Sequence, residues 1–368
     1  MANDKASKSK SRMLELVTPA FSTMHSQINW LHVTLHEQVT LTNWSSLRGK
    51  WQKLDSTHVF PFGYYRCKSH LTTYFVKILN ENHAKLTKEA DVLCQYLAGN
   101  GNLTLCLLEE YSCNIHYQTD HASLLCFLYL DSRFFNDSFD DIKLIANSTA
   151  QLHNSLALYS QQNNIKLASE QKMSTLISHW HLLLQSKKEL EKLPKTAQSI
   201  LQNNKETCFD VFTQDTQVIH GDLNRGNLLF TANTLYIIDF EDSLSTFSSP
   251  LQDIAFIIER FILNQTTFIT ENIETKIFLF LNEYFTTLNN KASLNRFQQN
   301  DNIIVNIIRA ISIKSLLILA KQSHQQGFLV HIAEWEKFIE NIDYITSNQE
   351  QIIRLTTSWF SHYPKIRL

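Results

Sequence analysis

The sequence predicts an α+β fold in two lobes: a small N-terminal lobe built on a β-sheet with one main helix, and a larger, α-rich C-terminal lobe. Residues 57–79 are rich in aromatic and β-branched side chains, which favour strands. From residue 138 onward the pattern is mostly helical. The helix expected between them, residues 81–98, carries apolar side chains at helical spacing: Leu86, Ala90, Leu93 and Leu97. Strands followed by a run of helices are typical of α+β folds.

The N-terminal lobe is expected to span residues 13–130. The segment "THVFPFGYYRCKSHLTTYFVKIL", residues 57–79, predicts a β-hairpin with Gly63 at a turn. Two further strand-like runs, near residues 103–117 and 123–130, complete a small sheet with one helix against it. The stretch "GNGN" directly after the predicted helix ends that helix, because glycine and asparagine disfavour helix interiors.

The C-terminal lobe is expected to span residues 131–368. Glycine and proline are nearly absent from its later part, where only Gly327 and Pro364 interrupt the helical pattern. Helices are predicted there over residues 251–264, 270–289, 301–325 and 329–360. The segments "QNNK" and "NRFQQNDN" are interpreted as polar loops, and residues 1–12 as a disordered tail.

Composition predicts an ordinary soluble protein. Hydrophobic residues make up 43% of the chain and charged residues 18%, with a formal net charge of −2, so charge names no nucleic-acid or membrane partner. The six cysteines show no CxxC pairing, which favours a reducing, cytoplasmic location. The basic N-terminus lacks a following apolar region, and the apolar stretches fall short of the roughly 18 residues that span a bilayer.

Polar side chains of the kind that carry out catalysis or bind metal ions gather within residues 218–242. "VIHGDLNRGNLLF" is followed after a short turn by "LYIIDFED", and the apolar runs in both segments read as short strands. Asp222, Asn227 and Asp239 therefore lie at the ends of neighbouring β-segments. One carboxylate can then face a substrate hydroxyl, while the amide and the other carboxylate hold a hard divalent cation through oxygen ligands. Phosphoryl transfer from a nucleotide requires this division of roles.

These motifs resemble those of a known family. "HGDLNRGN" followed by "IIDFED" is similar to the paired H-G-D-x-x-x-x-N and I-D-F motifs of the aminoglycoside phosphotransferase and choline kinase superfamily, relatives of the protein kinases. The resemblance implies a two-lobed protein-kinase-like fold and a phosphotransferase that uses ATP and Mg²⁺. It implies that Asp222 is the catalytic base, that Asn227 and Asp239 bind Mg²⁺ on the ATP phosphates, and that His220 stabilises the loop. Taken alone, Asp222 and Asn227 would also suit a turn with Asx hydrogen bonds.

The resemblance also implies two nucleotide-binding residues upstream. The strand "YFVKIL" carries Lys77, which is similar to the strand lysine that contacts the ATP phosphates. Glu89, on the predicted helix, corresponds to the glutamate that pairs with that lysine. Without the resemblance, Lys77 would suit an exposed strand face and Glu89 a solvated helix surface.

Flanking segments extend the resemblance over about residues 40–290. "IANSTAQLHNSL" is similar to a helix of the family's second lobe, and "PLQDIAFII" to the helix that follows the metal-binding aspartate. The resemblance gives Asp253 a structural role at a helix start, where a carboxylate binds free backbone N–H groups. Glu241 and Asp242 suit either a second cation or substrate contact, or a charged strand end.

One departure from the family concerns the turn that covers the phosphates. This turn is often rich in glycine, whereas "FPFGYYRCKSHLTT" offers only Gly63. The hydroxyl groups of Ser69, Thr72 or Thr73 are the candidates that would replace backbone N–H groups there.

The acceptor is expected to bind between the catalytic loop and the C-terminal helices, and the sequence leaves its identity open. Aminoglycosides and choline are cationic and call for carboxylates or aromatic walls, and homoserine is a third type of acceptor. Aromatic residues at helical spacing are more often core residues. The candidates after residue 250 are Glu259, Glu283, Glu334, Glu336, Phe256, Tyr284, Trp335, Tyr344 and Trp359.

Two other functions are consistent with the same motifs. An atypical protein kinase would need an activation loop, but residues 243–252 alone separate Asp242 from Asp253 and contain no A-P-E sequence. A nucleotide-binding pseudokinase that serves as an interaction module would be expected to lack one of Lys77, Asp222 or Asp239. The sequence therefore favours a small-molecule kinase, with the oligomeric state and the choice between ATP and GTP left open.

Overall fold

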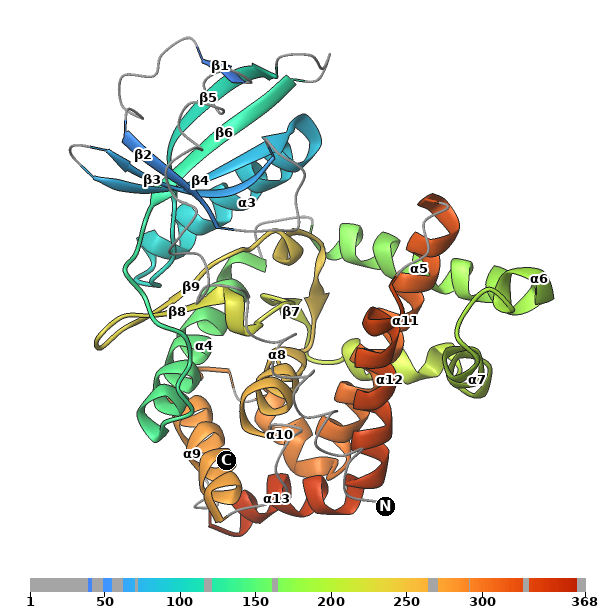
Figure 1. Cartoon of the computed structure of the whole chain (residues 1–368). Coiled ribbons are helices and arrows are strands. Elements are labelled where there is room, and N and C mark those ends of the chain that lie inside the picture. The colour runs from blue at the N-terminus through green and yellow to red at the C-terminus, as the bar shows by residue number, and fades with distance from the viewer. Residues whose placement is uncertain are drawn as a thin grey trace, which may run out of the picture. The chain divides into compact units, whose positions relative to one another are not determined.

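The computed structural model describes residues 39–41, 49–54, 62–69, 72–115, 121–160, 165–263, 271–290, 292–326 and 331–362. The predicted tail, residues 1–12, lies outside the described residues. The chain divides into two compact units: Met1–Lys88 with Leu105–Asp131, and Glu89–Thr104 with Ser132–Leu368. A β-sheet dominates the first unit and helices dominate the second (Figure 1), which confirms the predicted α+β class.

The first unit is built on a six-stranded antiparallel sheet with the strand order β1-β5-β6-β4-β3-β2. Its strands are β1 (Val39–Leu41), β2 (Gly49–Lys53), β3 (Gly63–Ser69), β4 (Thr73–Asn80), β5 (Leu107–Ile115) and β6 (His121–Leu128). The predicted hairpin forms from β3 and β4. The position predicted for Gly63 was wrong, because Gly63 is the first residue of β3 and the chain reverses between Ser69 and Thr73.

The two faces of this sheet bury different side chains, since successive residues of a strand point to opposite faces. Val76 and Ile78 of β4 belong to a buried cluster with Trp51 and Tyr65. Leu79 belongs to a second cluster that includes Ala84 of the following helix. Lys77 alternates with Val76 and Ile78, so it lies on the face of Leu79, the face that the helix covers.

The helix α3 (Glu81–Gly99) confirms the predicted helix. It begins after Asn80, whose side-chain oxygen accepts a hydrogen bond from the backbone N–H of His83 at 3.0 Å. It ends at the predicted "GNGN" stretch, where Gly101 has a φ of 81°. The backbone N–H and the side chain of Asn102 both donate to the carbonyl of Leu97, which closes the last turn.

The second unit consists mainly of helices with two short β-ribbons at its centre. Its helices are α4 (Phe139–Ser160), α5 (Ile165–Gln185), α6 (Lys187–Leu190), α7 (Lys195–Asn203), α8 (Leu251–Ile257), α9 (Glu271–Thr287), α10 (Ala292–Gln299), α11 (Ile303–Gln326), α12 (Ile332–Ser347) and α13 (Gln349–His362). The ribbons pair β7 (Gln217–Val218) with β10 (Phe247–Ser248), and β8 (Leu228–Phe230) with β9 (Leu235–Ile237). Short 3₁₀ segments are η2 (Glu206–Phe212), η3 (Arg225–Asn227) and η4 (Asp242–Ser245), and η5 (Ile258–Ile262) is a π-helix.

The C-terminal helices differ from the prediction in two places. The single helix predicted over residues 329–360 is two helices, α12 and α13, because the chain leaves helical geometry at Asn348. The predicted polar loop "NRFQQNDN" is largely helical in α10, and Phe297 within it is buried against Phe285 and Trp359. A single buried aromatic residue in a polar segment carries no periodic pattern, so tertiary packing decided the outcome.

One described helix, α11, is long and apolar enough to cross a membrane over Ile303–His324, but 61% of that window is buried inside the protein. This burial identifies α11 as the core helix of the second unit, which helices α5, α8, α12 and α13 contact.

Candidate active site

The loop between β7 and β8 carries the motif predicted to be catalytic. Gly221 has a φ of 84°, and a Cβ at this position would lie 3.1 Å from Oγ1 of Thr246, so glycine is required on both counts. Asn224 precedes the 3₁₀ turn η3 and caps it. Its side-chain oxygen accepts hydrogen bonds from the backbone N–H groups of Gly226 at 2.7 Å and Asn227 at 3.2 Å.

Asp222 and Asn227 are in direct contact. The Nδ2 of Asn227 donates to the backbone oxygen of Asp222 at 2.8 Å and to its Oδ2 at 3.2 Å. The Nδ2 of Asn224 donates to the same Oδ2 at 2.8 Å. Because its amide nitrogen binds Asp222, the side-chain oxygen of Asn227 lies on the opposite side of the amide group. Asn224 was not predicted as a site residue, although the local pattern D-x-N-x-G is a capping signal.

Asp239 follows β9 and is exposed. Its φ of 69° lies in the left-handed region, which few non-glycine residues adopt and which often marks functional sites. The backbone N–H of Ile238 donates to the carbonyl of Asn227 at 3.0 Å, which ties the end of β9 to the loop. The structure thus brings Asp222, Asn227 and Asp239 together at the ends of adjacent β-segments.

The surroundings of Asp222 favour its protonated form, mainly through burial. Burial raises the pKa of Asp222, and the negative charges of Asp242 and Asp239 raise the pKa further. His220 and the hydrogen bond from Asn224 act in the opposite direction but do not cancel these effects. A carboxyl group with a raised pKa is suited to proton transfer near neutral pH.

His220 is fully buried and holds the loop from within. Its Nε2 donates to the carbonyl of Ile238 at 3.0 Å, and its Nδ1 accepts from the backbone N–H of Asp222 at 3.3 Å. One neutral tautomer satisfies both bonds. The ring also packs on Phe240, with 4.7 Å between centroids. These contacts are those of a residue that stabilises the loop.

Asp253, buried at the start of α8, connects the loop to the helical core. Its Oδ2 accepts from the backbone N–H of His220 at 2.9 Å, and its Oδ1 accepts from that of Gly221 at 3.0 Å. The same Oδ2 lies 3.0 Å from Nε2 of His153 in α4, whose Nδ1 lies 2.7 Å from the hydroxyl of Tyr284 in α9. The helices α8, α4 and α9 therefore fix the position of the turn His220–Asp222, called the HGD turn below. The sequence pattern gave His153 no such role.

Lys77 and Glu89 lie on separate elements, and their predicted pairing stays a prediction. Lys77 is partly buried on β4, with its Nζ 5.7 Å from the ring centroid of Tyr64. Glu89 is exposed on α3. Of the hydroxyl groups named for the phosphate turn, the side chain of Ser69 lies outside the described residues, whereas Thr72 and Thr73 are partly buried next to β4.

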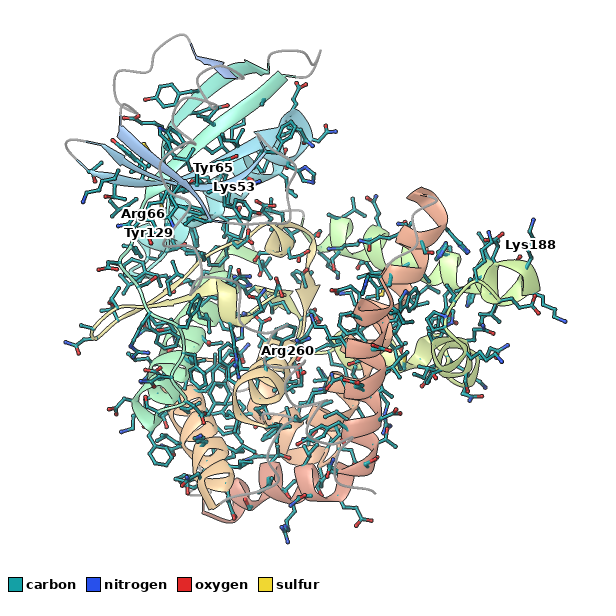
Figure 2. All side chains as sticks on the ribbon, viewed as in Figure 1. Lys53, Tyr65, Arg66, Tyr129, Lys188 and Arg260 are labelled. Atoms are coloured by element: carbon teal, nitrogen blue, oxygen red, sulfur yellow. The ribbon has the colours of Figure 1, made fainter. Side chains whose placement is uncertain are left out.

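Charged side chains of both signs surround the loop. Glu259 of the π-helix η5 is buried and accepts from Nε of Arg260 at 2.7 Å; Arg260 is labelled within the helical unit in Figure 2. Burial raises the pKa of Glu259. Among the aromatic candidates, Tyr284, Trp335 and Trp359 are core residues with at most 3% exposure.

The residues predicted to bind Mg²⁺ fit that cation chemically. The carboxylate of Asp239 and the amide oxygen of Asn227 are hard oxygen donors. Asp239 lies close enough to the loop for its negative charge to raise the pKa of Asp222. Within the described ranges, no three His, Cys, Asp or Glu side chains form a complete metal site. A cation that takes its remaining ligands from nucleotide phosphates and water needs only one or two protein carboxylates.

Several solved structures are similar to this chain at low identity. A choline kinase from Streptococcus pneumoniae is 15% identical, with 85% of this chain and 98% of that chain covered and a TM-score of 0.49. An ethanolamine kinase from Plasmodium vivax is 15% identical, with 82% and 81% covered and a TM-score of 0.49. An aminoglycoside phosphotransferase from Alicyclobacillus acidocaldarius is 11% identical, with 83% and 92% covered and a TM-score of 0.42. A comparison with curated proteins returns no match.

The family comparison covers the whole candidate site. The model described as "Phosphotransferase enzyme family" matches residues 64–274, which include β4, α3, the loop with Asp222 and Asn227, Asp239, and β3 except Gly63. The match extends over more than half of the chain, and it agrees with the enzyme class that the motifs predict. The chain therefore belongs to the phosphotransferase enzyme family, whose members are small-molecule kinases.

Proposed function

We propose that the protein transfers the γ-phosphate of ATP to a hydroxyl group of a small molecule, in the class that includes aminoglycosides, choline and homoserine. The observation that carries this proposal is the contact of Asn227 with Asp222, at 2.8 and 3.2 Å, beside the exposed carboxylate of Asp239. The carboxylate of Asp222 is thereby held by amide donors, while the carboxylate of Asp239 and the amide oxygen of Asn227 are of the donor type that a hard divalent cation prefers.

Asp222 would act as the catalytic base. It would accept a hydrogen bond from the acceptor hydroxyl, orient the oxygen toward the γ-phosphorus and take up the proton as the new P–O bond forms. Asn224 and Asn227 would hold the carboxylate in one orientation through their hydrogen bonds to Oδ2. The hydrogen bonds that Asp253 accepts from the backbone of His220 and Gly221 would keep the loop in place during the reaction.

The residues that would hold the nucleotide lie far apart in the sequence. Asn227 and Asp239 would bind Mg²⁺, which would neutralise charge on the ATP phosphates. Lys77 would contact the phosphates, with Glu89 as its partner. In this proposal residues 13–130 form the nucleotide-binding lobe, residues 131–368 form the catalytic and acceptor-binding lobe, and the enzyme works in the cytoplasm.

A small-molecule acceptor is favoured over a protein acceptor by the short connection after Asp239. The chain passes through the 3₁₀ segment η4 and the two-residue strand β10 directly into α8. This connection leaves no extended activation loop, which protein kinases use to bind a peptide.

The test is an ADP-release assay on the full-length protein with ATP and Mg²⁺. The acceptors are kanamycin, choline, ethanolamine and homoserine, and the Asp222→Asn variant serves as the blank. We expect Asp222→Asn to lower kcat about a hundredfold or more while ATP still binds, because a proton acceptor is removed from a formed site. Asp239→Asn should instead abolish Mg²⁺-dependent binding of ATP.

Asp343→Asn is the matched control, because it removes the carboxylate of an exposed residue on α12 that has no proposed role in the site. Wild-type turnover in the Asp222→Asn variant would refute the assignment of the base. Failure of the wild-type protein to bind ATP in the presence of Mg²⁺ would point to a different function, such as a protein-interaction module.

A further inference from the structure

Two lysines from separate helices meet at the 3₁₀ segment η4. Lys172 of α5 donates from Nζ to Oδ1 of Asp242 at 3.1 Å and to Oγ of Ser245 at 2.9 Å. Lys314 of α11 lies with its Nζ 5.8 Å from the ring centroid of Phe212 and interacts electrostatically with Lys172 and Asp242. Helices α5 and α11 contact each other (Figure 1). Lys314 interacts across this contact with both Lys172 and Asp242.

This site adjoins the proposed catalytic base. The hydroxyl of Ser243, in η4, donates to the carbonyl of His220 at 3.1 Å, which fixes η4 against the HGD turn. The charge of Asp242 also acts directly on Asp222. A molecule bound at Lys172 and Lys314 would therefore lie beside Asp222.

The charges at this site do not balance. Lys172 and Lys314 are two cations, and among the described residues Asp242 is the carboxylate that acts on both. On another side of Asp222, Arg260 and Lys337 are balanced by Glu259 and Glu334. The excess of positive charge around the base thus lies on the α5 and α11 side.

Lys314 lacks an acceptor for its ammonium protons. Within the part of the chain that the structure describes, no hydrogen bond or ion pair joins its Nζ to an oxygen, and the side chain is partly buried. The pKa of Lys314 is lowered to about 8, mainly by burial and also by the neighbouring Lys172, while Asp242 acts in the opposite direction. An unpaired, desolvated ammonium group is costly, and an anion beside it would remove that cost. Lys172 is 44% exposed, so a dissolved ligand can reach the pair.

We infer that the acceptor carries an anionic group, a carboxylate or a phosphate, which binds between Lys172 and Lys314 while its hydroxyl group faces Asp222. This inference rests on the proposed function and narrows its acceptor class. Among the acceptor types considered above, a homoserine-like molecule carries such a group, whereas choline does not.

The transfer step balances with ATP as the phosphate donor. The bond between the γ-phosphorus and its bridging oxygen breaks, and a bond from the γ-phosphorus to the acceptor oxygen forms. The hydroxyl proton passes to the carboxylate of Asp222, and ADP leaves. The lysines take no part in these bonds, since they hold the anionic end of the acceptor.

The experiment compares acceptors that differ in the anionic group, on the full-length enzyme with ATP and Mg²⁺. In the carboxylate arm homoserine is compared with 3-amino-1-propanol, and in the phosphate arm glycerol 3-phosphate is compared with glycerol. We expect one anionic acceptor to exceed the counterpart that lacks its anionic group at least about tenfold in kcat/KM, because charge-assisted hydrogen bonds are lost in the counterpart. Choline represents the cationic acceptors.

Variants then assign the effect to the two lysines. Lys172→Met and Lys314→Met should each raise KM for the anionic acceptor about tenfold or more, with KM for ATP changed less than about twofold. Lys166→Met is the matched control, because Lys166 is also on α5 and is 65% exposed in a weak pair with Glu170 at 3.9 Å. It should change neither constant.

A second readout does not require that the true acceptor is among those tested. Lysines of the enzyme saturated with ADP and Mg²⁺ are labelled at pH 8 with an amine-reactive reagent, and labelling is mapped by mass spectrometry. Homoserine, glycerol 3-phosphate or inorganic phosphate should slow labelling of Lys314 at least about threefold relative to Lys166, and choline should not.

The inference fails if none of these anions protects Lys314, or if choline or glycerol exceeds both anionic acceptors in kcat/KM. Either result leaves the proposed function intact as long as the wild-type enzyme binds ATP with Mg²⁺ and Asp222→Asn is inactive. Loss of those two properties would refute the proposed function itself.

Discussion

His153 and Asp253 form a hydrogen bond in the interior of the helical unit, with 3.0 Å between Nε2 and Oδ2 and side-chain exposures of 0% and 1%. The carboxylate also accepts the backbone N–H groups of His220 and Gly221, so this buried group has three donors. A buried carboxylate with this many donors is stable only while each donor is present. Asp253 therefore fixes the position of the turn His220–Asp222. Its own partner, His153, lies one hundred residues away in the sequence.

The first prediction concerns Asp253→Asn. The amide keeps one acceptor oxygen and turns an NH₂ group toward buried N–H donors, so at least one donor loses its partner. We expect a loss of about 2–4 kcal/mol in the free energy of unfolding and a lower kcat. Urea denaturation measures the first and the ADP-release assay the second. The control Asp343→Asn, at an exposed position of α12, should change the free energy of unfolding by less than about 0.5 kcal/mol. An equal effect of both variants would contradict the structural role of Asp253.

The second prediction separates two roles of Asn224. Its oxygen caps η3, whereas its nitrogen donates to Asp222 at 2.8 Å. Asn224→Asp keeps the capping oxygen and removes the donor, so stability should fall by less than about 1 kcal/mol while kcat falls about tenfold to a hundredfold. Asn224→Ala should lose both. Measurements of kcat, KM for ATP and the urea midpoint distinguish them, and an unchanged kcat in Asn224→Asp would show that the donor does not position Asp222.

Local patterns allowed much of this site to be predicted. Asp222, Asn227 and Asp239 stand at the ends of short apolar runs, and the structure places those runs in the strands β7, β8 and β9. Helix α3 followed from its apolar spacing and its glycine stop. In each case the information lies within about twenty residues, where backbone geometry and side-chain alternation act directly.

Long-range contacts could not be predicted in this way. Lys172 and Lys314 lie on different helices, and each alone looks like a lysine on a helix surface. The partner of His153 is set by the packing of α4 on α8 and α9, which no local period encodes. Asn348 ends α12, where its backbone N–H and its Nδ2 both donate to the carbonyl of Tyr344. Asparagine also occurs inside helices, so the residue type alone did not mark this break.

The third prediction concerns the pair Arg133 and Asp141. Two nitrogens of Arg133 donate to the two carboxylate oxygens of Asp141 at 2.6 and 2.7 Å, and Asp141 is 1% exposed. Burial would raise the pKa of Asp141, but the bonds from Arg133, with those from Asn136 and Ser138, hold the pKa below its usual value. Arg133→Met leaves the carboxylate buried without its cation, and should lower the free energy of unfolding by about 2–4 kcal/mol at pH 7.

The stabilisation by the pair Arg133 and Asp141 depends on pH, and the direction follows from the lowered pKa of Asp141. Because the folded pKa of Asp141 is lowered, the stabilisation is complete above the unfolded pKa of about 3.9 and is lost as the pH falls through the folded value. The difference between Arg133→Met and wild type should therefore shrink below about pH 4, measured by urea denaturation across pH. Lys187→Met removes a pair whose lysine is 88% exposed and should have almost no effect at any pH.

The fourth prediction is that Lys314→Met stabilises the protein. The pKa of Lys314 is lowered from 10.5 to about 8 by burial, so its charged form is disfavoured in the folded state. Below pH 8 the lysine is charged in both states and its full cost is present. As the pH rises toward 10.5 the folded protein loses the proton first, and the cost disappears. Methionine at this position should add about 1–3 kcal/mol at pH 7 and progressively less above pH 8.

This combination distinguishes a binding residue from a structural one. Urea midpoints at pH 7 and pH 9.5 measure the stability, and Lys166→Met, at an exposed position of α5, should change neither midpoint. A side chain that costs stability while it supports binding of the acceptor is expected where function opposes folding. If Lys314→Met instead destabilised the protein at pH 7, the ammonium group would be satisfied in the folded state and no anion would be needed beside it.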